Sequence, residues 1–365
     1  MRLGVRAALV DGRLLPGDVA IEDGVVTAVG VGGESGRGIA APGFVDLQVN
    51  GFAGVDLTGA DLAGYRRAGE AMLATGVTAF QPTFVSGPEE QVIDAVRAMP
   101  AADDTGPRIL GAHLEGPFLS PHKPGAHDPR HVRAPDLALL GRLLDAGDVA
   151  HMTLAPELHG AFELIDALLA RGVTVACGHT NATAAEAHLA FDRGARTVTH
   201  LFNAMRPSTP RDPGIALAAL SRSDVTVQLI VDGRHLAPDT VTVAWRAAAG
   251  RFALITDAVA AAAAGDGEFV VGSLRVRASG GVVRAEDGML AGSALTMIDA
   301  VRNLHALGAP LEEALAAGSA VPARIAGRHD LGRLAPGAPA DVVVLDDRLE
   351  IQRVLVDGAV RVAVG

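Results

Sequence analysis

The stretch GFVDLQVN, residues 43–50, is the first of eight apolar runs in this chain that each end on a polar or charged residue. The other seven are residues 77–83 (VTAFQPT), 109–115 (ILGAHLE), 151–157 (HMTLAPE), 173–179 (VTVACGH), 195–200 (ARTVTH), 225–232 (VTVQLIVD) and 252–257 (FALITD). Most of the intervening segments are rich in Ala, Leu and Arg and are long enough for a helix. Strand and helix alternating eight times predict an α/β fold, a TIM-like (β/α)8 barrel.

The ends of these runs carry the residues of chemical interest. In a (β/α)8 barrel the carboxyl ends of the strands build the active site. The polar residues that fall there are Gln48, Asn50, Glu115, His179, His200 and Asp257.

Composition restricts the class of protein and its partners. A chain of 365 residues with 49% apolar and 20% charged residues is typical of a globular protein with one large barrel and a smaller domain. The net charge of −11 argues against a nucleic-acid partner, because phosphate backbones need a basic surface. The lone cysteine, Cys177, excludes an intrachain disulfide, and we expect it to pack as a small apolar residue rather than act as a ligand or nucleophile.

The sequence favours a cytoplasmic protein without a membrane segment. The N-terminal stretch MRLGVRAALVDGRLLPGD meets charged residues too soon for a secretory signal. No apolar run in the chain is long enough to cross a bilayer.

Both ends of the chain look like short strands joined by turns. Asp-Gly pairs separate alternating apolar stretches in residues 1–40 and again in 335–365, and such pairs are hairpin signals. Neither end buries a sheet face alone, so we expect them to form one small β-sandwich domain beside a barrel of residues 41–334. Residues 265–290 also resemble hairpins, either of that domain or of an insertion after the eighth strand. Helices are predicted at about 296–307 and 311–327, the second opening with Pro310.

Three residues form the candidate metal site. Glu115, His179 and His200 end the third, fifth and sixth runs, and two imidazoles with one carboxylate make an open zinc site. A single histidine is more often a core or surface residue, but three ligand types at neighbouring strand ends favour the metal site. Asp257, at the eighth strand end, is the candidate general base, with helix capping as the alternative.

The first strand indicates a single metal. Gln48 and Asn50 stand where two histidines would bind a second ion. Neutral amides are poor zinc ligands, so we expect this second-metal position to be vacant. Lys123 is the chain's single lysine and lies in a predicted loop, so no lysine at a strand end is available to be carbamylated and bridge two metals.

Candidate groups for an anionic substrate lie near strands six and seven. No phosphate-binding glycine loop is present in the required setting. Arg211, His235 and the turn at Asn203-Ala204 offer cationic and backbone donors instead, with surface salt bridging as the alternative for Arg211. Residues 118–131 (FLSPHKPGAHDPRH) are predicted to be a mobile loop over the site. His127 within it is a candidate to polarise a substrate carbonyl, with no such role as the alternative.

Eight motifs give the chain a family resemblance. In order they are PGFVDLQVNG, HLEGPF, GAH, GHTNAT, THLFNAM, VDGRH, LITDA and LAGSALTM, spread over about residues 40–340. Together they resemble the N-acetylglucosamine-6-phosphate deacetylase family of the amidohydrolase superfamily. That family removes the acetyl group from N-acetylglucosamine 6-phosphate in amino-sugar catabolism and cell-wall recycling. HLEGP and THLFNAM are specific to it, whereas PGFVD occurs in many amidohydrolases.

The resemblance implies a role for each matching residue. Glu115, His179 and His200 would bind one divalent metal, zinc most of all, with iron or another divalent ion as alternatives. Asp257 would act as the acid and base, and His127 with the metal would polarise the amide carbonyl. The implied substrate-binding residues are Ala126, His127, Asn203, Ala204, Arg211, His235, Leu290, Ala291 and Gly292. The resemblance also implies a homodimer in which Arg211 reaches the neighbouring active site.

Two alternatives remain open at the level of sequence. A related amidohydrolase acting on another N-acyl amino sugar or a cyclic amide would keep the barrel and the metal but lack the HLEGP and THLFNAM motifs. A non-catalytic binding barrel would have lost a ligand or the base, yet all four residues are present.

Overall fold

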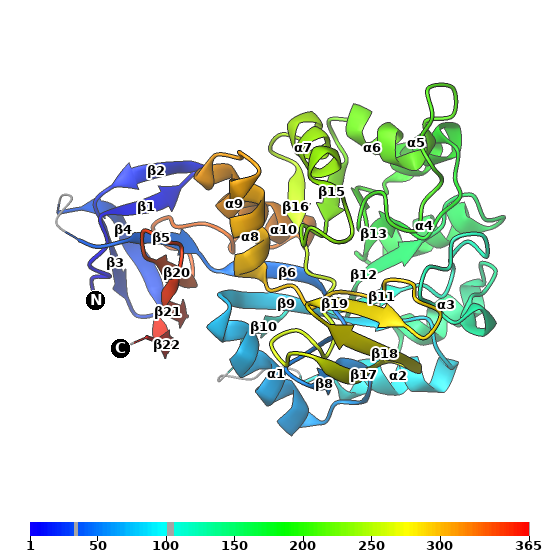
Figure 1. The fold of residues 1–365 in the computed structure, drawn as a ribbon, viewed down its shortest axis with the longest axis horizontal. Coiled ribbons are helices and arrows are strands. Elements are labelled where there is room, and N and C mark those ends of the chain that lie inside the picture. Colours follow the sequence, from blue (N-terminus) through cyan, green and yellow to red (C-terminus); the bar gives the residue numbers. More distant parts are fainter. Residues whose placement is uncertain (33–35, 101–105, 365) are drawn as a thin grey trace.

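The computed structural model describes residues 1–32, 36–100 and 106–364, and parallel strands form its centre (Figure 1). The eight barrel strands are β6 (Phe44–Val49), β9 (Val77–Val85), β11 (Ala112–Glu115), β12 (Val149–Leu154), β13 (Thr174–Cys177), β14 (Thr197–Val198), β15 (Thr226–Leu229) and β16 (Phe252–Leu254). Each pairs in parallel with the next along the chain, and a short strand β10 (Arg108–Ile109) adds to β9. The predicted α/β barrel is confirmed.

Backbone and side-chain contacts connect the first and last strands of the barrel. The backbone bridge there joins Val49 to Ala258, and the Asn50 amide donates to the Ala258 carbonyl at 2.8 Å. Earlier on β6, the Asp46 carboxylate accepts from the Thr256 hydroxyl at 2.5 Å. Both residues are buried, so this contact joins β6 to the segment after β16 inside the protein.

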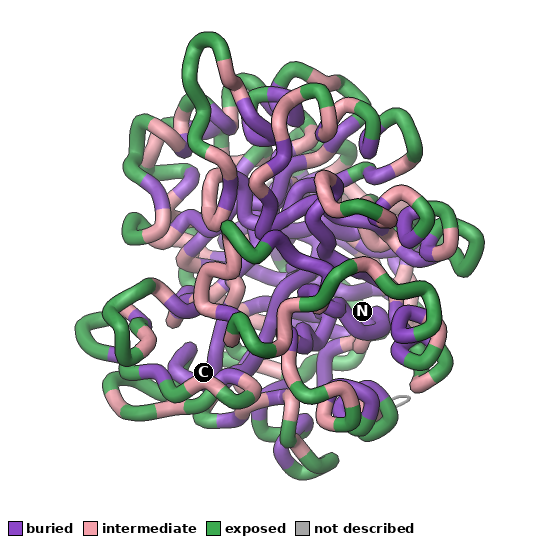
Figure 2. The backbone as a smooth tube through the Cα atoms, turned by 90° about the vertical axis from the view of Figure 1, so that its right-hand side faces the viewer, coloured by how far each residue is buried: buried purple, intermediate pink, exposed green. Residues whose placement is uncertain are grey.

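Figure 2 shows buried backbone at the centre of the molecule with exposed segments around it, and helices follow the barrel strands in turn along the chain. They are α1 (Leu62–Ala74), α2 (Glu89–Ala98), α3 (Leu137–Leu144), α4 (Ala161–Ala170), α5 (Ala184–Arg193), α6 (Gly214–Ser221), α7 (Pro238–Ala247) and α8 (Met297–Ala306). Side-chain hydrogen bonds cap the N-termini of several helices. Asp61 accepts from the Gly64 amide at the start of α1, and Thr183 forms a capping box with Glu186 at the start of α5. In the part of the chain that the structure describes, no helix has the length and apolar character needed to span a membrane.

The predicted helix over 311–327 is wrong as a single element. The structure divides it into α9 (Leu311–Ala317) and α10 (Ala320–Ile325). Pro322 has no N–H to donate to the Gly318 carbonyl, and that carbonyl accepts instead from the Val45 amide of β6 at 2.9 Å. The break therefore attaches the last helices to the first barrel strand.

The two chain ends form one β-sandwich beside the barrel, as predicted (Figure 1). A six-stranded sheet has the order β2 (Arg13–Pro16), β1 (Ala7–Val10), β5 (Ile39–Pro42), β20 (Val342–Leu345), β21 (Ile351–Val356), β22 (Ala359–Ala363). Its partner is the hairpin of β3 (Asp18–Glu22) and β4 (Val25–Val31). Alternate residues of β20 serve the two faces: Val342 and Val344 pack toward this hairpin, whereas Val343 and Leu345 join the barrel core.

The segment after the eighth strand forms a separate small sheet. We call β17 (Gly267–Val271), β18 (Leu274–Ser279) and β19 (Val282–Ala285) the pocket sheet. Among the described residues its strands pair only with one another, and its apolar face packs on Val85 and Ala126 of the barrel. The division of the chain into residues 1–40 with 335–365 and 41–334 stays a prediction.

Candidate active site

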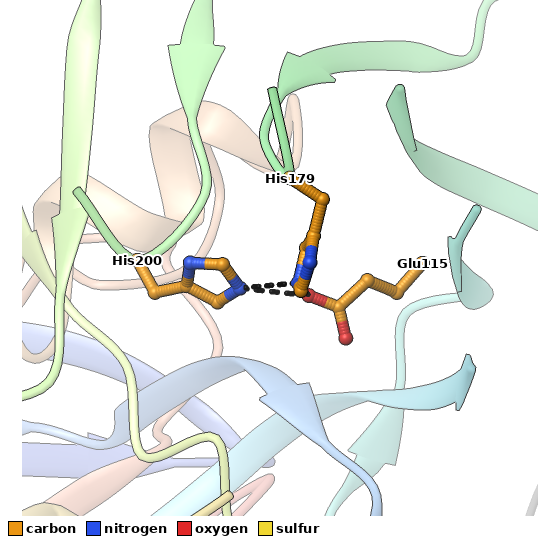
Figure 3. Close-up of side chains that lie close together, drawn as sticks. All are labelled: Glu115, His179 and His200. Carbon is orange, nitrogen blue, oxygen red and sulfur yellow. Dashed lines mark hydrogen bonds and ion pairs between the residues drawn. The ribbon is translucent and has the colours of Figure 1, made fainter. Parts of the chain in front are cut away.

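Glu115, His179 and His200 converge at the carboxyl end of the barrel (Figure 3). Glu115 ends β11, and the two histidines follow β13 and β14. His179 Nε2 lies 3.1 Å and His200 Nε2 2.9 Å from the same oxygen of Glu115, and the two nitrogens lie 3.0 Å apart. All three side chains are buried. The residues predicted as metal ligands are thus brought together.

This cluster fits a divalent cation. Ligand atoms around tetrahedral zinc stand about 3.3 Å apart, given zinc–nitrogen bonds of about 2.0–2.1 Å. His179 Nδ1 lies 3.1 Å from the Lys123 carbonyl, which fixes a proton on Nδ1 and leaves the Nε2 lone pair facing the cluster. Burial and the neighbouring histidines lower the pKa of His179 to about 4, so its imidazole is neutral, the form that binds metal.

Glu115 supplies the negative charge of the cluster. Burial alone would raise the pKa of its carboxyl, but the neighbouring imidazoles of His127, His179 and His200 hold that pKa well below the usual range. Glu115 is therefore a carboxylate at neutral pH, and it offers a cation an anionic oxygen between two imidazoles.

The backbone is strained where the site residues stand. His179, His200 and Asp257 have φ of 46°, 30° and 49°, in the left-handed region that residues other than glycine rarely adopt. Such strain is concentrated at functional sites, where the surrounding fold holds it in place. Here it turns each side chain inward directly after its strand.

Asp257 lies at the same end of the barrel, partly buried beside the cluster. Its Oδ1 accepts from Asn50 Nδ2 at 2.8 Å and from Gln48 Nε2 at 3.1 Å. Burial and the charge of Glu115 raise the pKa of Asp257, and a raised pKa suits a group that must both accept and return a proton. Among the described helices, none uses Asp257 as its N-cap.

Gln48 and Asn50, which the sequence analysis assigned to a vacant second-metal position, lie beside the cluster. The Gln48 amide nitrogen donates to Glu115 at 3.0 Å as well as to Asp257, so a neutral amide connects the two carboxylates. The side-chain amide oxygens of Gln48 and Asn50 are buried without a hydrogen-bond partner among the described atoms. This arrangement agrees with the prediction of one metal per chain, which stays a prediction.

His127 lies in the loop over the cluster, as the sequence indicated. The Ser86 amide donates to His127 Nδ1 at 3.2 Å, so the ring proton resides on Nε2. Nε2 points into the site, 3.7 Å from Glu115 Oε2. His127 is therefore arranged as a hydrogen-bond donor to whatever occupies the pocket.

A pocket of about 300 Å³ opens over these residues. Of the predicted substrate-binding residues, those that line it are Ala126, His127, Asn203, Ala204, His235, Leu290, Ala291 and Gly292. His235 is held by Asp232, whose carboxylate lies 2.7 Å from His235 Nδ1, so Nε2 faces the pocket. Arg211 does not line the pocket: it is exposed on the loop before α6.

The sequence analysis missed one wall of the pocket. Val271, Ser273 and Leu274 of the pocket sheet line it, together with Val259 and Met289. The hairpin pattern of 265–290 was visible, but nothing in the sequence indicated that the sheet folds over the barrel mouth. That placement depends on apolar contacts with residues distant in the chain.

Comparison with known proteins agrees with this site. The amidohydrolase family model matches residues 39–361, and the chain belongs to this family of hydrolases. It is 39% identical to human N-acetylglucosamine-6-phosphate deacetylase over 344 residues, 89% of this chain and 84% of the relative. It is 35% identical to N-acetylgalactosamine-6-phosphate deacetylase of Escherichia coli O157:H7, covering 87% and 86% of the two chains.

A solved structure shows the same fold with substrate. It is a mutant of N-acetyl-D-glucosamine-6-phosphate deacetylase from Mycobacterium smegmatis in complex with N-acetyl-D-glucosamine-6-phosphate. The TM-score is 0.94 at 37% identity, and the match covers 100% of this chain and 99% of the other. The predicted family resemblance is confirmed.

Proposed function

We propose that this protein hydrolyses the acetamido group of N-acetylglucosamine 6-phosphate, giving glucosamine 6-phosphate and acetate. The observation that carries the proposal is the convergence of Glu115, His179 and His200 beside Asp257 at the floor of one pocket. Relatives that match most of the chain bear the name of this activity. All four residues are present, which argues against a non-catalytic barrel.

One divalent metal, preferably zinc, belongs to the proposal. Glu115, His179 and His200 would hold it, with the donor types that zinc prefers. When bound, such a cation supplies Lewis-acid chemistry, lowering the pKa of water and polarising a carbonyl oxygen. The amides of Gln48 and Asn50 are poor ligands for a second ion, and iron remains the alternative metal.

The protein's own residues handle the proton and the carbonyl. Asp257 takes a proton from the water that attacks the acetyl carbon, and returns it to the sugar nitrogen as the carbon–nitrogen bond breaks. His127 donates its Nε2 proton in a hydrogen bond to the carbonyl oxygen, where negative charge develops. Gln48 and Asn50 hold the Asp257 carboxylate in place by their amide groups.

The phosphosugar is assigned to the outer pocket. His235 and the turn at Asn203-Ala204 line it, and Leu290 begins the facing segment. Arg211 is exposed and has no hydrogen bond or ion pair among the described residues, so we assign it to the phosphate of a neighbouring subunit in a homodimer. A cytoplasmic location stays a prediction.

The similarity to an N-acetylgalactosamine-6-phosphate deacetylase supports a second candidate substrate. The two sugars differ only in the orientation of one ring hydroxyl, so the same metal and base would serve both. The choice between them depends on contacts along the pocket walls.

An acetate-release assay combined with metal analysis tests the function. We expect the purified protein to contain one divalent ion per chain and to release acetate from N-acetylglucosamine 6-phosphate. Chelation should abolish the activity, and zinc should restore it. His179→Ala should lose both the metal and the activity while its circular dichroism remains that of the wild type. Two tightly bound ions per chain at full activity would contradict the single-metal site.

A further inference from the structure

Asp56 is a partly buried carboxylate that the proposed chemistry does not use. It ends β8 (Val55–Asp56), in the loop after the first barrel strand. Its Oδ1 accepts from the Thr58 amide at 3.1 Å and caps the short 3-10 helix Leu57–Gly59. Its Oδ2 accepts from the Gly272 amide at 3.0 Å, 216 residues further along the chain.

Gly272 stands at the turn between β17 and β18 of the pocket sheet. Its φ of +58° favours glycine, and a Cβ there would lie 3.2 Å from Val85 Cγ2. The turn is thus pressed against the end of β9. The next two residues, Ser273 and Leu274, line the pocket, so the position of this turn determines where one pocket wall stands.

Apolar contacts alone do not fix that position closely. The sheet packs on the barrel through Val271, Val276 and Val283, and such contacts lack direction. Of the hydrogen bonds that described residues make, only Asp56–Gly272 joins residues 267–285 to the chain before Asp257. This bond therefore adds a directional contact between the turn and the loop after the first barrel strand.

The choice of aspartate fits two tasks. Burial raises the pKa of Asp56 to about 6, so keeping a carboxylate here opposes folding. A serine, threonine or asparagine would cap the short helix with one acceptor atom. Aspartate offers a second acceptor oxygen, and here that oxygen accepts from the Gly272 amide.

We propose that Asp56 is a positioning residue for substrate binding, which holds the Gly272 turn so that Ser273 and Leu274 form the pocket wall against the sugar. The identity of the sugar rests on the proposed function. Among the described residues, Asp56 makes no hydrogen bond or ion pair with the three cluster residues or with Asp257, so we expect its effect to fall on binding and not on the chemical step.

Two variants of Asp56 separate its tasks. Asp56→Asn keeps one acceptor oxygen for the Thr58 cap and loses the bond to Gly272, whereas Asp56→Ala loses both. We expect both to raise KM for N-acetylglucosamine 6-phosphate about tenfold with little change in kcat, because an interaction made equally in ground and transition states is removed. Amide hydrogen exchange should become faster in residues 271–276 of either variant.

Asp61→Ala is the matched control. Asp61 caps α1 through the Gly64 amide at 2.8 Å and has no bond to the pocket sheet. The Asp61→Ala variant should lower Tm, as Asp56→Ala does, but leave KM for the phosphosugar unchanged. A double-mutant cycle with Leu274→Ala adds a second readout: Asp56→Asn should raise KM less in the Leu274→Ala background than alone.

Two results would overturn the positioning role. One is an unchanged KM for Asp56→Asn in a protein whose wild type is active, and the other is unchanged exchange in residues 271–276. Failure of the proposed function would show differently, as a metal-loaded wild type that releases no acetate from the phosphosugar. In that case the exchange measurement still decides whether Asp56 holds the turn.

Discussion

Asp257 combines a raised carboxyl pKa with firm placement at the floor of the pocket. Two amide groups donate to the same oxygen, Oδ1, and leave Oδ2 free to exchange a proton. A carboxylate beside an anionic neighbour and out of water binds a proton more readily than in solution. These features are what a group needs if it is to act first as base and then as acid.

Asp257→Asn should reduce kcat by about a hundredfold or more, because an amide cannot accept the proton of the attacking water. Metal content should stay near that of the wild type, since Asp257 lies outside the three-residue cluster. Steady-state kinetics with metal analysis on the same preparation checks both. Turnover close to the wild type would assign the acid and base role to another residue.

At the scale of elements, the barrel depends on a buried contact between its first and last strands. Asp46 on β6 accepts from the Thr256 hydroxyl and amide, just after β16. Burial raises the pKa of Asp46 to about 7, because the ionised form is poorly solvated there. The hydrogen bonds from Thr256 favour the ionised form, but the cost of burying the charge is larger, so folding is most favourable when Asp46 carries its proton.

Asp46→Asn should change how stability depends on pH. The folded chain keeps the Asp46 proton up to about pH 7, whereas the unfolded chain loses it above about pH 4. The contribution of Asp46 to the free energy of unfolding therefore falls as the pH rises from about 4 to about 7. Asparagine cannot ionise. Between these pH values the free energy of unfolding of the variant should therefore rise relative to that of the wild type by up to about 4 kcal/mol.

Denaturant unfolding of both metal-loaded chains from pH 4 to pH 7.5 measures this difference. The metal contribution cancels between them because Asp46 is not a ligand. Parallel stability curves for the two chains would mean that the Asp46 carboxyl titrates alike in the folded and unfolded states.

At the scale of the whole molecule, separate units build the pocket. The barrel supplies the candidate metal ligands and Asp257, and the pocket sheet supplies an apolar wall, whereas Arg211 lies outside the pocket on the exposed loop before α6. The terminal sandwich joins the barrel core through apolar residues such as Val343 and Leu345. Under the proposed dimer, a complete substrate site needs two chains.

Arg211→Ala should lower kcat/KM for N-acetylglucosamine 6-phosphate by roughly 10- to 150-fold, the value of a charge-assisted contact of about 1.5–3 kcal/mol. Activity on the unphosphorylated sugar, low from the start, should hardly change. Kinetics on both sugars checks this. Equal losses on the two would mean that Arg211 supports the fold instead.

Mixing chains tests whether Arg211 acts between subunits. In a hybrid dimer of Arg211→Ala and Asp257→Asn chains, one site combines an intact Asp257 with an intact Arg211 of the partner subunit. Partial activity should therefore return. Mixtures that stay as inactive as the separate variants, although exchange of subunits is shown by mass, would place Arg211 in its own subunit's site.

The sequence alone determined the barrel and the three candidate metal ligands, because both follow from local pattern. A buried parallel strand is a short apolar run, and the residue that ends it faces the barrel mouth, so Glu115, His179 and His200 were identifiable from where their runs stop. Motifs read along the chain then gave the family.

Tertiary structure decided how distant segments meet. Gln48 connects Glu115 to Asp257, Asp46 closes the barrel through Thr256, and Asp56 reaches Gly272. The partners in each case lie some 67 to 216 residues apart. Local propensity carries no signal for such pairs, since each depends on which surfaces the folded elements bring together. For the same reason the pocket wall became visible only in the structure, whereas the break before α10 has a local cause in Pro322.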